Sequence, residues 1–142
     1  MDFEISVQIA AAPATVWSVI ADIERWHQWT PSVRRIRRLD RGPLRIGSVA
    51  LVRQPRLPPA IWKVTALDPG HSFTWRSGMP GMWVYGEHAV AGREGGARAT
   101  LALHFVGMFG GVLGGLTRTL NERYLRLEAD GLKRRSEELA RT

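Results

Sequence analysis

The residues best suited to metal binding and proton transfer are four histidines, because the chain contains no cysteine. His27, His71, His88 and His104 never pair at the four-residue spacing of a helical metal site, and no cluster of Asp or Glu accompanies them, so we expect no metal and no cofactor. The chain also has no Ser-His-Asp order, no GxSxG nucleophile elbow and no glycine loop that could hold a phosphate. The sequence therefore contains no recognisable catalytic constellation.

His88 is the histidine whose surroundings are most apolar. If residues 82–90 form a strand, His88 shares one face with Met82, Val84, Gly86 and Val90, while Tyr85 and Glu87 point to the other face. This position is typical of a buried histidine that bonds a backbone carbonyl, and it also suits a group that contacts a ligand or transfers a proton.

Three further side chains could serve acid–base chemistry. Arg53 would point inward with Val49 and Leu51 if that strand alternates cleanly, although Ala50 and Val52 could equally point inward. Tyr124 lies on the apolar stripe of a predicted C-terminal helix. Glu128 follows it by one turn, and we expect it to be a carboxylate at the rim that pairs with an arginine.

Six tryptophans are an unusual supply for 142 residues. Trp62 and Trp75 fall on neighbouring predicted strands, where they could either wall a pocket or fill the core. Trp26 and Trp29 lie three apart at the end of a short helix and are interpreted as packing or cavity-entrance residues, with His27 turned towards solvent.

Hydrophobic periodicity defines the elements that must position these residues. Alternation predicts a first strand over residues 3–9, helical spacing with Pro13 in the first turn predicts one or two short helices over 13–29, and spacing by three and four predicts one long amphipathic helix over 112–139. Turn signals separate six further strands, at 33–40, 47–54, 60–68, 71–77, 82–90 and 97–106. This order predicts an α+β fold in which a seven-stranded antiparallel curved sheet is covered by the long helix.

Composition sets limits on location and partners. The N-terminus carries Asp2 and Glu4 in place of the basic residues of a signal peptide, and the most apolar run, 105–116, is shorter than the roughly 20 residues of a membrane-spanning helix, so we read that run as a flexible junction. We therefore expect a cytoplasmic protein without a membrane span, as one domain over residues 1–142.

The net charge is +7, and 18 of the 20 basic residues are arginine. The densest basic tract is RRIRR, residues 34–38, but in a strand its arginines divide between the two faces. We interpret this segment as an edge strand that its charge protects from pairing with other sheets, and we expect no nucleic-acid partner.

Several local motifs resemble one superfamily. They are Ala12-Pro13-Ala14-Thr15-Val16-Trp17, Trp26 with Trp29-Thr30-Pro31, the segment 62–70 (WKVTALDPG), Phe73-Thr74-Trp75, Gly86-Glu87-His88, and 128–133 (EADGLK). Together with the element order, which covers nearly the whole chain, they resemble the START-like, Bet v 1-like (SRPBCC) superfamily and its polyketide cyclase/dehydrase branch. The resemblance implies a helix-grip fold with an apolar cavity between the sheet and the long helix. The residues that we expect to line this cavity are Trp26, Trp29, Trp62, Trp75, Met82, Val84, His88, Leu116, Leu120 and Tyr124.

Three functions are consistent with the sequence. The first is binding or carriage of a hydrophobic small molecule such as a lipid or polyketide. The alternative is a polyketide aromatase/cyclase-type enzyme in the same cavity, with Arg53, His88 and Tyr124 as candidate catalytic groups. The third is a regulatory or chaperone-like interaction module that uses the segment 79–83 as an apolar rim. The sequence leaves open whether the protein is a monomer or a homodimer.

Overall fold

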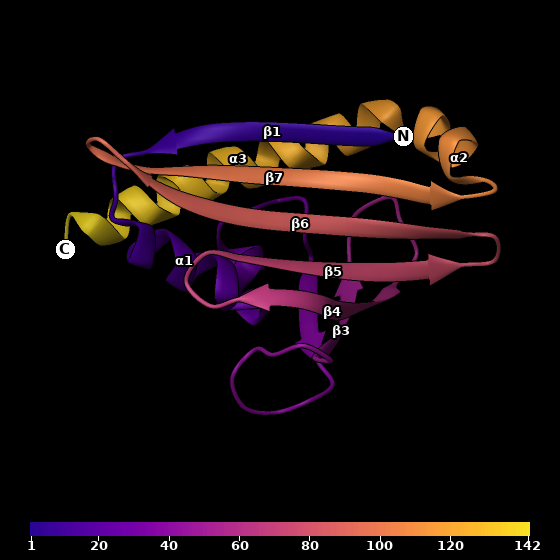
Figure 1. Ribbon diagram of the computed structural model, residues 1–142, viewed down its shortest axis with the longest axis horizontal. Helices are drawn as coiled ribbons and strands as arrows, with labels where there is room; N and C mark the ends of the chain where they lie inside the picture. The colour runs from indigo at the N-terminus through magenta and orange to yellow at the C-terminus, as the bar shows by residue number, and fades with distance from the viewer.

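The computed structural model describes residues 1–142 and contains one seven-stranded sheet with four helical segments (Figure 1). Strand β1 (Asp2–Ile9) is followed by helix α1 (Pro13–Ala21) and the 3-10 helix η1 (Ile23–Gln28). The six following strands are β2 (Arg35–Arg38), β3 (Val49–Arg53), β4 (Ala60–Asp68), β5 (Ser72–Met79), β6 (Met82–Arg93) and β7 (Gly96–Gly107). The chain ends with α2 (Gly110–Leu116) and α3 (Arg118–Ala140).

The sheet is antiparallel throughout, in the order β1-β7-β6-β5-β4-β3-β2. Figure 1 shows α3 lying behind the sheet, across β1 and β7. The short strand β2 forms one edge, with Ile36 buried and Arg35 and Arg37 exposed, so the prediction of a charged edge strand is confirmed.

Local sequence explains the main elements. In β1 the residues at both ends of the apolar face, Phe3 and Ile9, are buried, as strict alternation predicts. Pro13 occupies the first turn of α1, where a missing backbone N–H costs nothing. The two short helices and the seven-stranded sheet follow the predicted order.

The C-terminal helix is long, but its predicted start at residue 112 is wrong. The helical segment is divided at Thr117, whose backbone N–H and hydroxyl both donate to the Leu113 carbonyl. Four of the seven residues of α2 are glycine, which weakens its helical preference. The run 105–116 is therefore not a flexible junction but the end of β7 followed by α2. None of the helices combines the length and the hydropathy of a membrane-spanning segment.

Helix α3 makes a close contact, at Gly131, with Trp29, the residue that follows η1. A Cβ atom at this position would collide with the Trp29 carbonyl, so only glycine lets the two backbones approach. Arg134 donates a hydrogen bond of 3.0 Å to the same carbonyl. The indole N–H of Trp26 donates to the Ile20 carbonyl at 3.0 Å, which fixes the ring beneath the sheet. These contacts hold one end of α3 and leave its other half to border the interior space.

Candidate functional site

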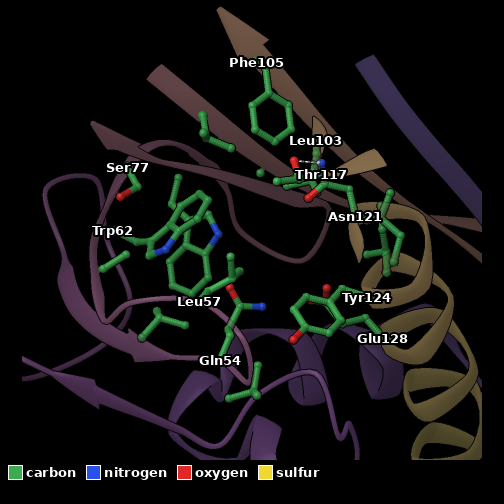
Figure 2. Close-up of a pocket in the computed structure, with 18 of the residues that line it drawn as sticks. Gln54, Leu57, Trp62, Ser77, Leu103, Phe105, Thr117, Asn121, Tyr124 and Glu128 are labelled. Carbon is green, nitrogen blue, oxygen red and sulfur yellow. Dashed lines mark hydrogen bonds between the residues drawn. The ribbon is translucent and has the colours of Figure 1, made fainter. Parts of the chain in front are cut away.

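A pocket of about 290 Å³ lies between the inner face of the sheet and helices α2 and α3. Its walls come from β3 to β7, from the loop after β3 at residues 54–58, and from the N-terminal half of α3. Hydrophobic residues make up 16 of the 25 that line it, so a ligand would lie mainly against carbon. Figure 2 shows Trp62 on one side of the space and Tyr124 with Glu128 on the other.

Indole rings form the wall on the sheet side. The rings of Trp62 and Trp75 lie 5.5 Å apart between centroids, and Trp75 lies 5.4 Å from Trp26. Gly86 makes this stacking possible, because a Cβ atom there would lie 3.0 Å from the Trp75 Nε1 atom. The glycine of the Gly86-Glu87-His88 motif therefore provides room for a tryptophan that borders the pocket.

Six of the ten residues expected to line a cavity border this pocket. They are Trp26, Trp62, Trp75, Val84, His88 and Tyr124. The other four lie elsewhere. Trp29 is buried but packs beside Trp26 and under α3, and Met82 belongs to a separate core cluster with Phe3 and Leu125.

The remaining two residues, Leu116 and Leu120, do not border the pocket because the C-terminal helix is divided. Leu116 ends α2 and is 79% exposed, because the break at Thr117 takes it out of phase with α3. Leu120 is half-buried and does not border the pocket.

Arg53 does not face the interior. In β3 the buried residues are Ala50 and Val52, so the alternative phase of this strand holds and Arg53 is exposed. A guanidinium on the outer face of the sheet cannot hold an oxyanion in the pocket. The prediction that Arg53 points inward is therefore wrong.

His88 is a neutral, buried side chain within the aromatic wall. Its ring stacks on Phe73 at 4.5 Å between centroids with 13° between the planes, and it lies 5.0 Å from the Trp26 ring. Burial lowers the pKa of His88 to about 3, against a smaller opposing effect of the Phe73 carbonyl. The Nδ1 atom is buried and has no hydrogen-bond partner within the protein.

Tyr124 and Glu128 enter the pocket from successive turns of α3. The Tyr124 hydroxyl donates a hydrogen bond to the Pro55 carbonyl, which ties the helix to the loop after β3. Glu128 makes no hydrogen bond within the protein, and none of the salt bridges includes it, so the expected pairing with an arginine is wrong. Burial raises the pKa of Glu128 to about 8, because no cation compensates the loss of hydration.

The pocket also contains polar groups that the sequence reading did not single out. Gln54 donates to the Ser32 carbonyl at 3.2 Å, and Asn121 donates to the Thr117 hydroxyl at 2.9 Å, which leaves the side-chain oxygen of each amide without a partner. Ser77 borders the pocket, and its hydroxyl makes no hydrogen bond within the protein. Helical spacing carried a signal for one of them, since Asn121 lies one turn before Tyr124 and Glu128 one turn after it, all on one face of the helix.

The segment 79–83 forms the turn between β5 and β6, at the same end of the sheet as α2 (Figure 1). Met79 is half exposed and borders the pocket, while Trp83 lies on the outer face with the Arg76 guanidinium 4.2 Å from its ring centroid. An apolar rim is therefore present at this end. In this structure no group of three or more His, Asp or Glu side chains could hold a metal ion.

A curved antiparallel sheet gripping a long C-terminal helix, with a pocket between them, defines the START-like class. Solved structures support this at the level of the fold. The Zhui aromatase/cyclase from Streptomyces sp. R1128 is 18% identical, with a TM-score of 0.78 over 96% of this chain and 93% of the other. A START superfamily protein from Mycobacterium smegmatis is also 18% identical, with a TM-score of 0.78 over 97% and 98%.

A third similar structure is the di-domain aromatase/cyclase StfQ of the steffimycin biosynthetic pathway, at 15% identity and a TM-score of 0.78. Here 99% of this chain corresponds to 52% of the other. No curated protein sequence matches the chain. The family model for polyketide cyclase/dehydrase and lipid transport proteins matches residues 1–137, and the chain belongs to this family.

Proposed function

We propose that the protein binds a hydrophobic small molecule in the pocket between the sheet and α3. The observation that carries this proposal is the pocket itself, a space of about 290 Å³ walled by three tryptophans and bordered mostly by apolar residues. A volume near the lower end of the range for small-molecule sites suits a compact ligand with one or two rings. The apolar surface that such a ligand removes from water would drive its binding.

The family and the fold support this proposal without fixing the ligand. The family description joins cyclases and dehydrases with lipid transport, and similar structures include aromatase/cyclases. A fold of this kind hosts several activities, so the pocket's own chemistry must decide between them.

The test is a titration with N-phenyl-1-naphthylamine, an uncharged dye that becomes fluorescent in apolar surroundings. The wild-type protein should give saturable fluorescence. Val84→Phe should lose most of it, because Val84 lines the pocket and a phenyl ring there fills part of the space. Ala91→Phe adds the same ring at an exposed position of β6 and should leave binding unchanged. Equal binding by the three proteins would contradict the proposal.

A second candidate function is cyclisation of a polyketide-like substrate, because one carboxyl group in the pocket could move a proton. The Glu128 carboxyl borders the pocket with no cation beside it, and burial raises its pKa to about 8. A carboxyl with a pKa near neutral can donate a proton to a substrate carbonyl and take one back, as an aldol cyclisation and dehydration requires, whereas His88, with a pKa of about 3, is too weak a base for this step.

This function is tested with a synthetic linear tetraketone, by following its cyclisation with mass spectrometry. If the protein is a cyclase, it should accelerate ring closure, and Glu128→Gln should remove the acceleration while dye binding persists. Equal rates with and without the wild-type protein would leave only the binding function.

A further inference from the structure

The pocket contains no cation, although the chain carries 20 Lys and Arg residues and a net charge of +7. Every lysine and arginine side chain lies outside the set of residues that lines the space. An anionic group placed in this pocket would therefore lose its hydration without gaining an ion pair, and burial of an unpaired anion is strongly unfavourable.

Of the other titratable side chains in the lining, three are already engaged or neutral. The Glu87 carboxylate bonds His104 at 3.0 Å on the outer face of the sheet. His88 is buried and neutral within the aromatic wall, and the Tyr124 hydroxyl donates to the Pro55 carbonyl. Glu128 is the one titratable group that remains without a partner.

Helix α3 supplies no counter-ion to Glu128. The residues three and four positions away, which are the ones a helical side chain can reach, are Tyr124, Leu125, Gly131 and Leu132. None of these is charged. The carboxyl therefore has no local counter-ion, and it borders the pocket with the uncharged oxygens of Gln54 and Asn121 and the hydroxyl of Ser77 as the other free polar groups.

We propose that the pocket selects an uncharged hydrophobic molecule that carries a carbonyl or hydroxyl oxygen, that the Glu128 carboxyl hydrogen-bonds this oxygen, and that ligands with a carboxylate are rejected. This inference rests on the proposed binding function and specifies its ligand. A fatty-acid-like anion has the right apolar body for the pocket but the wrong head group, since it would face Glu128 with no cation in reach.

The test uses four probes that share a naphthalene body and differ in one substituent: naphthalene, 2-acetylnaphthalene, 2-naphthoate and 2-naphthylmethylamine. Each displaces N-phenyl-1-naphthylamine at about pH 7. For the wild-type protein, 2-acetylnaphthalene should bind about five-fold more tightly than naphthalene, as one added hydrogen bond provides. The anion 2-naphthoate should bind at least about ten-fold more weakly than 2-acetylnaphthalene.

Two substitutions at Glu128 separate the hydrogen bond from the exclusion of anions. Glu128→Leu removes the hydrogen-bonding group, so 2-acetylnaphthalene should fall to the affinity of naphthalene. Glu128→Gln keeps an N–H donor and removes the ionisable group, so 2-acetylnaphthalene should keep its advantage while 2-naphthoate gains affinity. Glu122→Leu, at an exposed position of the same helix, is the matched control and should reproduce the wild-type order. Circular dichroism verifies that each variant is folded.

Failure of the ligand specificity and failure of the binding function give different results. If no probe displaces the dye and the dye itself does not bind, the binding function is wrong. If all four probes bind equally, or Glu128→Leu leaves the order unchanged, the binding function stands and the specificity is wrong. Tightest binding of 2-naphthylmethylamine would also overturn the proposal, because it would make Glu128 the counter-ion of an ammonium group.

Discussion

Replacing Glu128 by glutamine should make the stability of the protein less dependent on pH. Burial raises the pKa of Glu128 in the folded state to about 8, whereas the unfolded chain has the ordinary value of 4.5. Between these values the folded protein holds a proton that the unfolded chain has released. The contribution of this proton to stability is therefore complete below about pH 4.5 and is lost as the pH rises through about 8.

The size of the effect follows from the two pKa values. Each pH unit between them changes the free energy of unfolding by about 1.4 kcal/mol, so complete desolvation would cost no more than about 5 kcal/mol. Judged by its accessible surface, the Glu128 side chain is only half-buried. Because it lines the pocket, solvent that enters the pocket screens its charge. We therefore expect a loss of about 2 kcal/mol between about pH 5 and about pH 9.

Urea unfolding across this pH range measures the loss. The difference in unfolding free energy between Glu128→Gln and the wild-type protein should grow with pH by about 2 kcal/mol in favour of the variant. His88 and His104 also titrate, but they are present in both proteins and cancel in the difference. Glu122→Gln, an exposed change on the same helix, should follow the wild-type curve. If the unfolding free energies of Glu128→Gln and the wild-type protein change with pH in parallel, the raised pKa of the Glu128 carboxyl is refuted.

Three further changes test the packing around the site. Gly111→Ala should stabilise the protein by up to about 1 kcal/mol, because its methyl group meets open space and alanine favours α2, whereas Gly110→Ala would place a methyl group 2.9 Å from the β7 backbone and should lower the melting temperature. Gly131→Ala should cost about 2 kcal/mol or more by collision with the Trp29 carbonyl, and an unchanged urea midpoint would disprove that contact. The pKa of His104 is raised by its hydrogen bond to a β6 carboxylate. The contribution of His104 to stability, under about 1 kcal/mol, should therefore be present below about pH 6.5 and be lost as the pH rises through the raised pKa. A stability difference between the wild-type protein and His104→Gln that grows with pH would contradict this.

The fold could be predicted because its signals are local. Strand alternation has a period of two residues, and turn residues separate the last six strands from one another, so the order of the strands could be read directly from the sequence. The division at Thr117 was missed because Leu113, Leu116 and Leu120 continue the three-and-four spacing across it. The glycines of α2 indicated a weak helix, but spacing alone cannot show where the backbone changes direction.

The site could be predicted only where a residue's face was defined by its own element. His88 and Tyr124 border the pocket because β6 and α3 have one clearly apolar face each. Arg53 was misplaced because β3 has only five residues, with apolar side chains on both faces, so its phase is fixed by pairing with β4. The sequence could not show that Glu128 lacks an arginine partner, because whether a cation reaches its carboxyl depends on elements distant in the chain.

The most direct test of a ligand-binding pocket is a titration followed through the six tryptophan side chains. Each indole N–H gives one resonance in a nitrogen–proton correlation spectrum, which Trp→Phe substitution assigns. With saturating N-phenyl-1-naphthylamine, the resonances of Trp62 and Trp75 should shift, because both rings line the pocket, and that of Trp83 on the outer face should not. Unmoved Trp62 and Trp75 resonances, or shifts confined to Trp83, would contradict binding in the pocket.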